Sequence, residues 1–210
     1  LVAGTTGRGI RTTFEPQTLS DGQSLRATFT FTTPQTVGVD RQDAFRVGLH
    51  DRLERAELEA DLSASSGVPN AHYNGLPGYM VTFDVNREDP TLNNVDIRRH
   101  IPVKTIGRLM GTYKGYDLLG EGGDSFTFDP ESRYTGALTV TKAADGLNVT
   151  GVLRDETGVM TEFSHFDEGS LVNNFGMLSF HVNSRTFGSS STPGKSDNGI
   201  EFSQVTLEIV

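Results

Sequence analysis

Arginine, histidine and asparagine side chains recur at alternate positions of segments whose other positions are apolar. Arg46 and His50, for example, alternate with phenylalanine, valine and leucine in residues 45–50. A guanidinium binds carboxylates through paired hydrogen bonds, and imidazole and amide groups both donate to and accept from hydroxyl groups. These side chains suit a glycan, so we expect a binding row made of Arg26, Arg46, His50, Asp84, Asn86, His181, Asn183 and Arg185. A solvated sheet face and a face covered by another subunit are the alternatives.

The elements that must position this row show alternation with a period of two, which indicates strands with one buried and one polar face. The pattern predicts strands over residues 24–32, 45–50, 79–86, 178–185 and 201–210, and a hairpin of residues 137–141 and 147–154. In the hairpin turn, Asp145-Gly146 is expected to supply a positive φ. Roughly ten such strands predict an all-β fold, an antiparallel β-sandwich (jelly roll) of two packed sheets with outward polar rows. Residues 51–65, rich in helix formers, predict one short helix in a loop.

Length, charge and cysteine content limit the function. The 210 residues fit a single domain spanning 1–210. The net charge of −9 argues against nucleic acid, whose phosphates need a basic face, and no apolar run is long enough for a membrane span. The lack of cysteine excludes disulfides, thiolate zinc sites and cysteine nucleophiles. Because the chain begins at Leu1, we expect an exported protein that has lost its signal peptide, either secreted or at the cell surface.

Several stretches resemble the concanavalin A-like, laminin G-type jelly rolls of exported bacterial proteins. The stretches that carry the resemblance are residues 21–25, 45–49, 78–81, 134–149 and 197–200, which together span most of the chain. The group contains lectins, carbohydrate-binding modules, glucanases and polysaccharide lyases. The resemblance therefore implies a jelly roll and a polysaccharide partner, and it leaves open whether the protein is an enzyme.

Two enzymatic alternatives follow from the same residues. A lyase acting on a uronic-acid polymer needs a cation that neutralises the carboxylate and a base that takes the α-proton. Arg46 or Arg185 could be that cation, and His50 or His181 that base, although the Gln-x-His and Tyr-Phe-Lys motifs of alginate lyases are missing. A hydrolase is the weaker alternative, because the Glu-x-Asp-x-x-Glu pattern that begins at Glu59 ends in alanine.

Cofactors and assembly are less constrained. We expect no cofactor, and the five histidines lack zinc-site spacing. Residues 120–124 or Asp197 and Asn198 could contribute oxygen ligands to a structural calcium. The basic cluster Arg98-Arg99-His100 either steers an anionic chain or is a solvated strand end. The third functional hypothesis is a structural or adhesive subunit that forms homo-oligomers, because open sheet edges favour assembly by strand addition.

Overall fold

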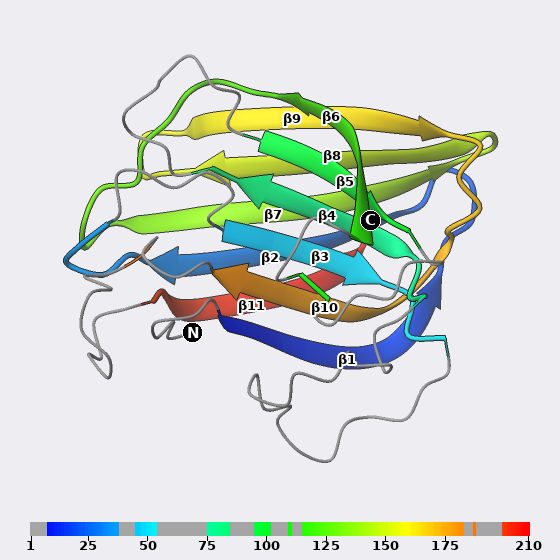
Figure 1. The fold of residues 1–210 in the computed structure, drawn as a ribbon, viewed down its shortest axis with the longest axis horizontal. Coiled ribbons are helices and arrows are strands. Elements are labelled where there is room, and N and C mark those ends of the chain that lie inside the picture. Colours follow the sequence, from blue (N-terminus) through cyan, green and yellow to red (C-terminus); the bar gives the residue numbers. More distant parts are fainter. Residues whose placement is uncertain are drawn as a thin grey trace.

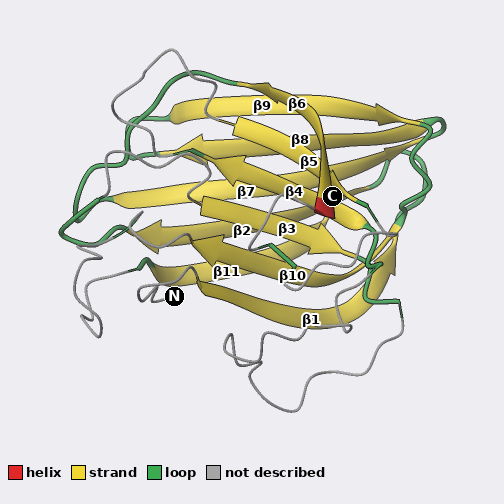
Figure 2. Cartoon of the chain, viewed as in Figure 1, coloured by secondary structure: helices red, strands yellow, loops and turns green. Residues whose placement is uncertain are grey.

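The chain folds into two antiparallel sheets that pack face to face (Figure 1). The computed structural model describes residues 8–37, 45–53, 75–84, 95–101, 109–110, 115–182, 187 and 199–210. Strands dominate the described residues, as Figure 2 shows. The eleven strands in this part of the chain are β1 (Arg8–Thr18), β2 (Ser24–Thr32), β3 (Phe45–His50), β4 (Gly78–Phe83), β5 (Val95–His100), β6 (Tyr116–Gly122), β7 (Arg133–Ala143), β8 (Gly146–Arg154), β9 (Val159–Glu168), β10 (Asn174–Val182) and β11 (Glu201–Ile209).

The strand order interleaves the two ends of the chain. One sheet has six strands in the order β1-β10-β3-β4-β5-β6, and the other has five in the order β11-β2-β7-β8-β9. The first strand therefore pairs with β10, and β2 pairs with the last strand, β11. This arrangement confirms the predicted antiparallel β-sandwich of the jelly-roll type.

Aromatic side chains join the sheets across the core. Phe29 of β2 lies edge-on to Phe180 of β10, with ring centroids 5.3 Å apart, and Phe31 lies 5.1 Å from Phe45 of β3. All four rings are buried in one continuous cluster. Because burying a phenylalanine side chain stabilises a fold by about 1.5–3 kcal/mol, this cluster fixes which face of each strand points inward.

The sequence-based strand limits agree best where alternation is strict. β2 and β3 have the predicted bounds, and the β7–β8 hairpin forms as expected. The explanation of its turn was wrong, because Gly146 lies in β8 and has no positive φ. A Cβ at this position would collide with the main-chain oxygen of Asp167 in the neighbouring strand, so close approach is what requires glycine.

Two sequence-based expectations concern helices, namely a short helix over residues 51–65 and the lack of a membrane span. Residues 51–53 are not helical, and the rest of the predicted 51–65 helix lies outside the described residues. No helix within the described ranges is both long and apolar enough to cross a membrane.

Candidate functional site

One face of the six-stranded sheet carries a row of polar side chains that crosses the strands. We call the side of this sheet that points away from the core the outward face. Strand register places one residue of each strand in line, in the order Gly9, His181, Arg46, Thr82, Asp96 and Glu121. Their sequence neighbours, such as Val47 and Val81, are buried in the core, so the row points outward. We name His181, Arg46, Thr82 and Asp96 the polar row.

A second group of polar side chains lies beside the polar row on the same face. His50 Nε2 lies 3.2 Å from the hydroxyl of Tyr116, and the rings of His50 and His100 have centroids 6.1 Å apart. His100 Nδ1 donates to the main-chain oxygen of Leu76. Gly78 pairs with His50, and any Cβ there would collide with the His50 ring. A glycine on β4 therefore lets the His50 ring lean over that strand. We name His50, His100 and Tyr116 the histidine cluster.

Burial keeps the histidine cluster uncharged. Desolvation, helped by the nearby His100, lowers the pKa of His50 to about 3. Desolvation also lowers the pKa of His100 and raises the pKa of Tyr116 well above its ordinary value. At neutral pH the two imidazoles are therefore neutral, and the phenol keeps its proton. Tyr116 donates that proton to the main-chain oxygen of Leu109 at 2.5 Å, so its oxygen accepts from His50 Nε2–H.

Three buried polar atoms on this face have no hydrogen-bond partner among the described residues. They are His50 Nδ1, Thr82 Oγ1 and His100 Nε2. Buried polar groups are nearly always hydrogen-bonded in native proteins, and an unsatisfied one costs about 1–3 kcal/mol. Their concentration on the outward face indicates a place where water or a ligand supplies the missing partners.

The centre of the outward face is covered by apolar side chains. Leu76, Met80, Leu109, Met110, Tyr116 and Met177 form a hydrophobic cluster separate from the core, which we name the outer cluster. Arg46 Nη1 donates to the main-chain oxygen of Met110 at 2.5 Å, and Ser179 Oγ lies 2.7 Å from Met110 Sδ. Arg46 is accordingly only 4% exposed. His181, beside it on β10, is also buried, at 8% exposed. The expectation of an open polar face was therefore wrong, because a distant segment packs over it.

The predicted binding residues divide among three locations. Arg46, His50 and His181 lie together on the outward face, and Asp84 directly follows β4 and is buried. Arg26 lies in β2 of the five-stranded sheet, where it forms an exposed ion pair with Glu208 at 3.6 Å. Its placement in the same row as the others was wrong. Asn86, Asn183 and Arg185 lie outside the described residues.

The basic cluster of residues 98–100 is split by the sheet. Arg98 points outward and pairs with Asp96 at 2.7 Å, whereas Arg99 points between the sheets and pairs with Asp167 at 2.8 Å. His100 joins the histidine cluster. Strict alternation along β5 could have separated these three residues, but no sequence signal placed Tyr116 or Met110 on this face.

Metal ligands are sparse in the described part of the chain. No group of three or more histidine, aspartate or glutamate residues there could hold a metal ion. Asp197 and Asn198, one of the two candidate calcium segments, lie outside the described residues.

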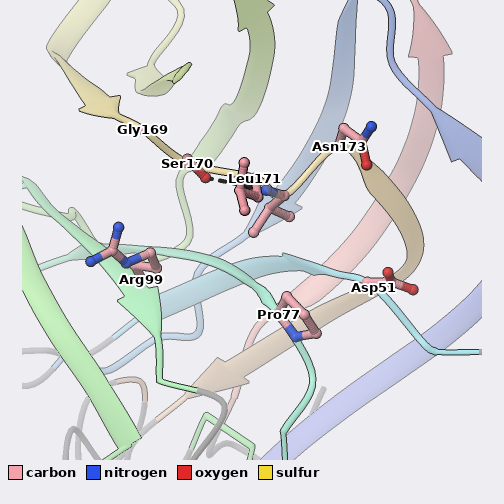
Figure 3. A pocket seen from close by; sticks show the side chains of 8 residues that line it. Asp51, Pro77, Arg99, Gly169, Ser170, Leu171 and Asn173 are labelled. Atoms are coloured by element: carbon pink, nitrogen blue, oxygen red, sulfur yellow. Dashed lines mark hydrogen bonds between the residues drawn. The ribbon is translucent and has the colours of Figure 1, made fainter. Parts of the chain in front are cut away.

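A pocket of about 310 Å³ opens at one end of the sandwich. It is lined by Asp51, Pro77, Arg99, Gly169, Ser170, Leu171, Val172 and Asn173. Figure 3 shows Arg99 and Asp51 on opposite sides, with Leu171 and Pro77 between them. Because the Arg99 guanidinium is bound to Asp167 of the opposite sheet, the pocket is separate from the outward face. Its volume is at the small end of the range for ligand sites.

Comparison with known proteins gives structural matches only. No family model matches the chain, and no curated protein does. Among solved structures, lectin I-B4 of Griffonia simplicifolia is 15% identical, covering 96% of this chain and 80% of its own, with a TM-score of 0.49. An alginate lyase in complex with an alginate trisaccharide is 11% identical, covering 92% and 73%, with a TM-score of 0.44. A legume lectin-like domain of Entamoeba histolytica is 10% identical, covering 100% and 81%, with a TM-score of 0.43.

These three structures are concanavalin A-like jelly rolls, the group that the sequence motifs resemble. At such low identities and TM-scores, the function must be inferred from the chain's own residues.

Proposed function

We propose that this protein binds a polysaccharide on the outward face of its six-stranded sheet. The observation that carries the proposal is a set of three buried polar atoms to which the described residues offer no partner, His50 Nδ1, Thr82 Oγ1 and His100 Nε2, on the side of the sheet opposite the core. Buried polar groups are nearly always hydrogen-bonded, and these three lie on one face, whereas the hydroxyl of Thr161, which also lacks a partner among the described residues, is a single atom in the other sheet. Unmet acceptors and donors on an outward face suit a ligand that brings hydroxyl groups.

The polar row and the neighbouring histidine cluster together fit a sugar chain. The neutral imidazoles of His50 and His100 and the hydroxyl of Thr82 can each donate or accept, as sugar hydroxyls do. Arg46 adds a charged donor next to Thr82 on the adjacent strand. The polar row crosses several strands, so it presents His181, Arg46, Thr82 and Asp96 in line, as an extended chain requires.

A pair of matched threonines provides the test. Thr82 and Thr161 are both 0% exposed, and the hydroxyl of each has no partner among the described residues, but Thr161 lies in β9 of the other sheet. Valine keeps the shape and removes the hydroxyl. Affinity electrophoresis on gels containing neutral or acidic polysaccharides should show that Thr82→Val weakens retention on at least one polymer, whereas Thr161→Val migrates as the wild type.

Two outcomes would contradict this proposal. If the variants were retained equally, the ligand would not contact the outward face at Thr82. If no polymer of the panel retarded the wild type, glycan binding itself would be wrong. A homo-oligomeric subunit seen by light scattering would then be the better explanation, since the core-side residues Val205 and Ile209 of edge strand β11 are exposed.

A lyase is the second candidate, and one observation favours it. The Tyr116 hydroxyl contacts His50 on the face that holds Arg46, and the charge of Arg46 lies close enough to lower the pKa of Tyr116 against the larger effect of burial. Arg46 could neutralise a uronate carboxylate while neutral His50 accepts the α-proton and Tyr116 protonates the leaving oxygen.

The lyase reaction has its own signature. β-Elimination leaves an unsaturated sugar that absorbs in the ultraviolet, so incubation with a uronic-acid polymer should raise the absorbance. Tyr116→Phe should abolish the rise, whereas some retention on gels should persist because Arg46 and Thr82 remain. Retention without any absorbance change in the wild type would leave a binding protein and exclude the lyase on that polymer.

A further inference from the structure

Two consecutive main-chain oxygens accept hydrogen bonds from two donors of the outward face. The oxygen of Leu109 accepts from the Tyr116 hydroxyl at 2.5 Å, and the oxygen of Met110 accepts from Arg46 Nη1 at 2.5 Å. Leu109 and Met110 are both buried, although neither lies in a strand of either sheet. A short piece of the chain thus makes the contacts that the proposed site would offer to a ligand.

Flexible methionine side chains make up much of the packing around these two residues. Three of the four methionines of the chain, Met80, Met110 and Met177, belong to the outer cluster. Methionine side chains are flexible and polarisable, and they are enriched at surfaces that repack on binding. The Met110 thioether lies over Gly48, where a Cβ would come within 3.0 Å of the sulfur. Glycine in the middle of β3 therefore makes the space that Met110 fills.

We infer that Leu109 and Met110 act as an internal substitute for the ligand, which closes the outward face until a ligand displaces them. This inference rests on the proposed function and adds the ligand class and its control. The displacing ligand must bring two acceptor oxygens, one for Arg46 and one for Tyr116. A carboxylate bound to a guanidinium makes a stronger hydrogen bond than a neutral carbonyl does. The ligand is therefore an acidic polysaccharide, in which a uronate carboxylate replaces the Met110 oxygen on Arg46.

A substitution that weakens the packing of Leu109 and Met110 on the outward face should strengthen ligand binding. The apparent affinity is the intrinsic affinity multiplied by the fraction of protein whose outward face is open. A variant that increases this fraction therefore raises the apparent affinity by the same factor. Met110→Ala removes the thioether that packs in the outer cluster and leaves Arg46 and Tyr116 in place. Met160→Ala is the matched control, because Met160 packs against the main core from β9.

Two measurements on each variant test the inference. Diethyl pyrocarbonate acylates neutral imidazole nitrogen, and peptide mass spectrometry reports each histidine separately. His50 and His100 should react slowly in the wild type and in Met160→Ala, and at least about tenfold faster in Met110→Ala. His165, part-exposed on β9, serves as the internal reference and should react equally in all three. Affinity electrophoresis with alginate, polygalacturonate and a neutral glucan should show a similar gain in Met110→Ala for the acidic polymers only.

The outcomes distinguish two claims: that Leu109 and Met110 close the outward face, and that this face binds a glycan. Unchanged acylation of His50 and His100 in Met110→Ala would contradict the closure by Leu109 and Met110, whatever the gels show. Faster acylation with no retention on any polymer would support the closure and overturn the proposed function. Faster acylation with stronger retention on the neutral glucan would overturn the acidic ligand class. A drop in thermal stability shared by both methionine variants is controlled by comparing them with each other.

Discussion

Tyr79 and Asp167 connect the two sheets through a hydrogen bond between buried groups, 2.8 Å from the phenol oxygen to Oδ2. Tyr79 comes from β4 and Asp167 from β9, so the bond crosses the sandwich at the end where the pocket opens. The same carboxylate accepts two contacts from Arg99 Nη1, at 2.8 and 3.1 Å. Burial raises the pKa of Tyr79, which keeps the phenol a donor over the whole working range of pH.

Tyr79→Phe should therefore destabilise the fold by about 1–3 kcal/mol, because it removes a buried hydrogen bond to a charged group. The free energy of unfolding in urea measures this loss. A double-mutant cycle with Asp167→Asn should show strong coupling, since the two residues contact each other. Additive losses would mean that the bond does not join the sheets in solution.

Stability should fall on acidification through His50. Its pKa is about 3 in the fold and 6.5 as a free side chain, so between these values the unfolded chain binds a proton that the folded chain does not. The contribution is present above about pH 6.5 and is lost as the pH falls toward 3. His100 titrates in the same direction.

His50→Gln isolates this effect, because glutamine keeps a donor toward Tyr116 and does not titrate. The free energy of unfolding of the variant should decline less steeply over this pH window than that of the wild type. Parallel curves would show that folding does not lower the pKa of His50.

Two glycines should respond differently to asparagine. Gly22 has φ +84° and nothing within 4 Å of a Cβ, and asparagine tolerates that conformation, so Gly22→Asn should cost less than about 1 kcal/mol. At Gly146 any side chain meets the Asp167 main chain and the Phe166 ring, so Gly146→Asn should cost about 1–3 kcal/mol or more. Thermal unfolding ranks the two, and the reverse order would contradict the close approach of β8 and β9.

Substitutions at Arg26 and Arg46 should show which of the two sheets binds the polysaccharide. Arg26→Ala removes an exposed ion pair worth less than about 1 kcal/mol and should leave retention on polysaccharide gels unchanged. Arg46→Gln should reduce retention, because Arg46 supplies the charged donor of the polar row. Loss of retention in Arg26→Ala alone would place the ligand on the five-stranded sheet.

Local patterning predicted much of the architecture. β2 shows its apolar face at every second residue, since Leu25, Ala27, Phe29 and Phe31 all face the core, and its bounds could be derived from the sequence. β3 follows the same rule. Period-two alternation depends only on neighbouring residues, so strand existence and the inward set of side chains were accessible without the structure.

The composition of the site depends on contacts between distant segments. Alternation says which side of β2 carries Arg26, but it does not say that β2 and β3 belong to different sheets. Nothing local to Arg46 reveals that Met110, 64 residues away, accepts its hydrogen bond. β3 is buried on both faces, and for that reason polar residues predicted to meet solvent are found beneath the outer cluster.

The pairing of the first strands with the last has a consequence for biosynthesis. Neither sheet can be completed until β10 and β11 have been made, because β1 and β3 pair with β10 and β2 pairs with β11. A nascent chain that ends before residue 174 therefore lacks β10, the neighbour of β1, and β11, one of the two neighbours of β2. In such a chain Phe29 of β2 also lacks its ring contacts with Phe180 and Phe202. Such non-local pairing slows folding and leaves strand edges open to other chains. We expect the newly made protein to depend on chaperone capture during synthesis, and its yield to fall sharply when translation pauses within the last forty or so residues.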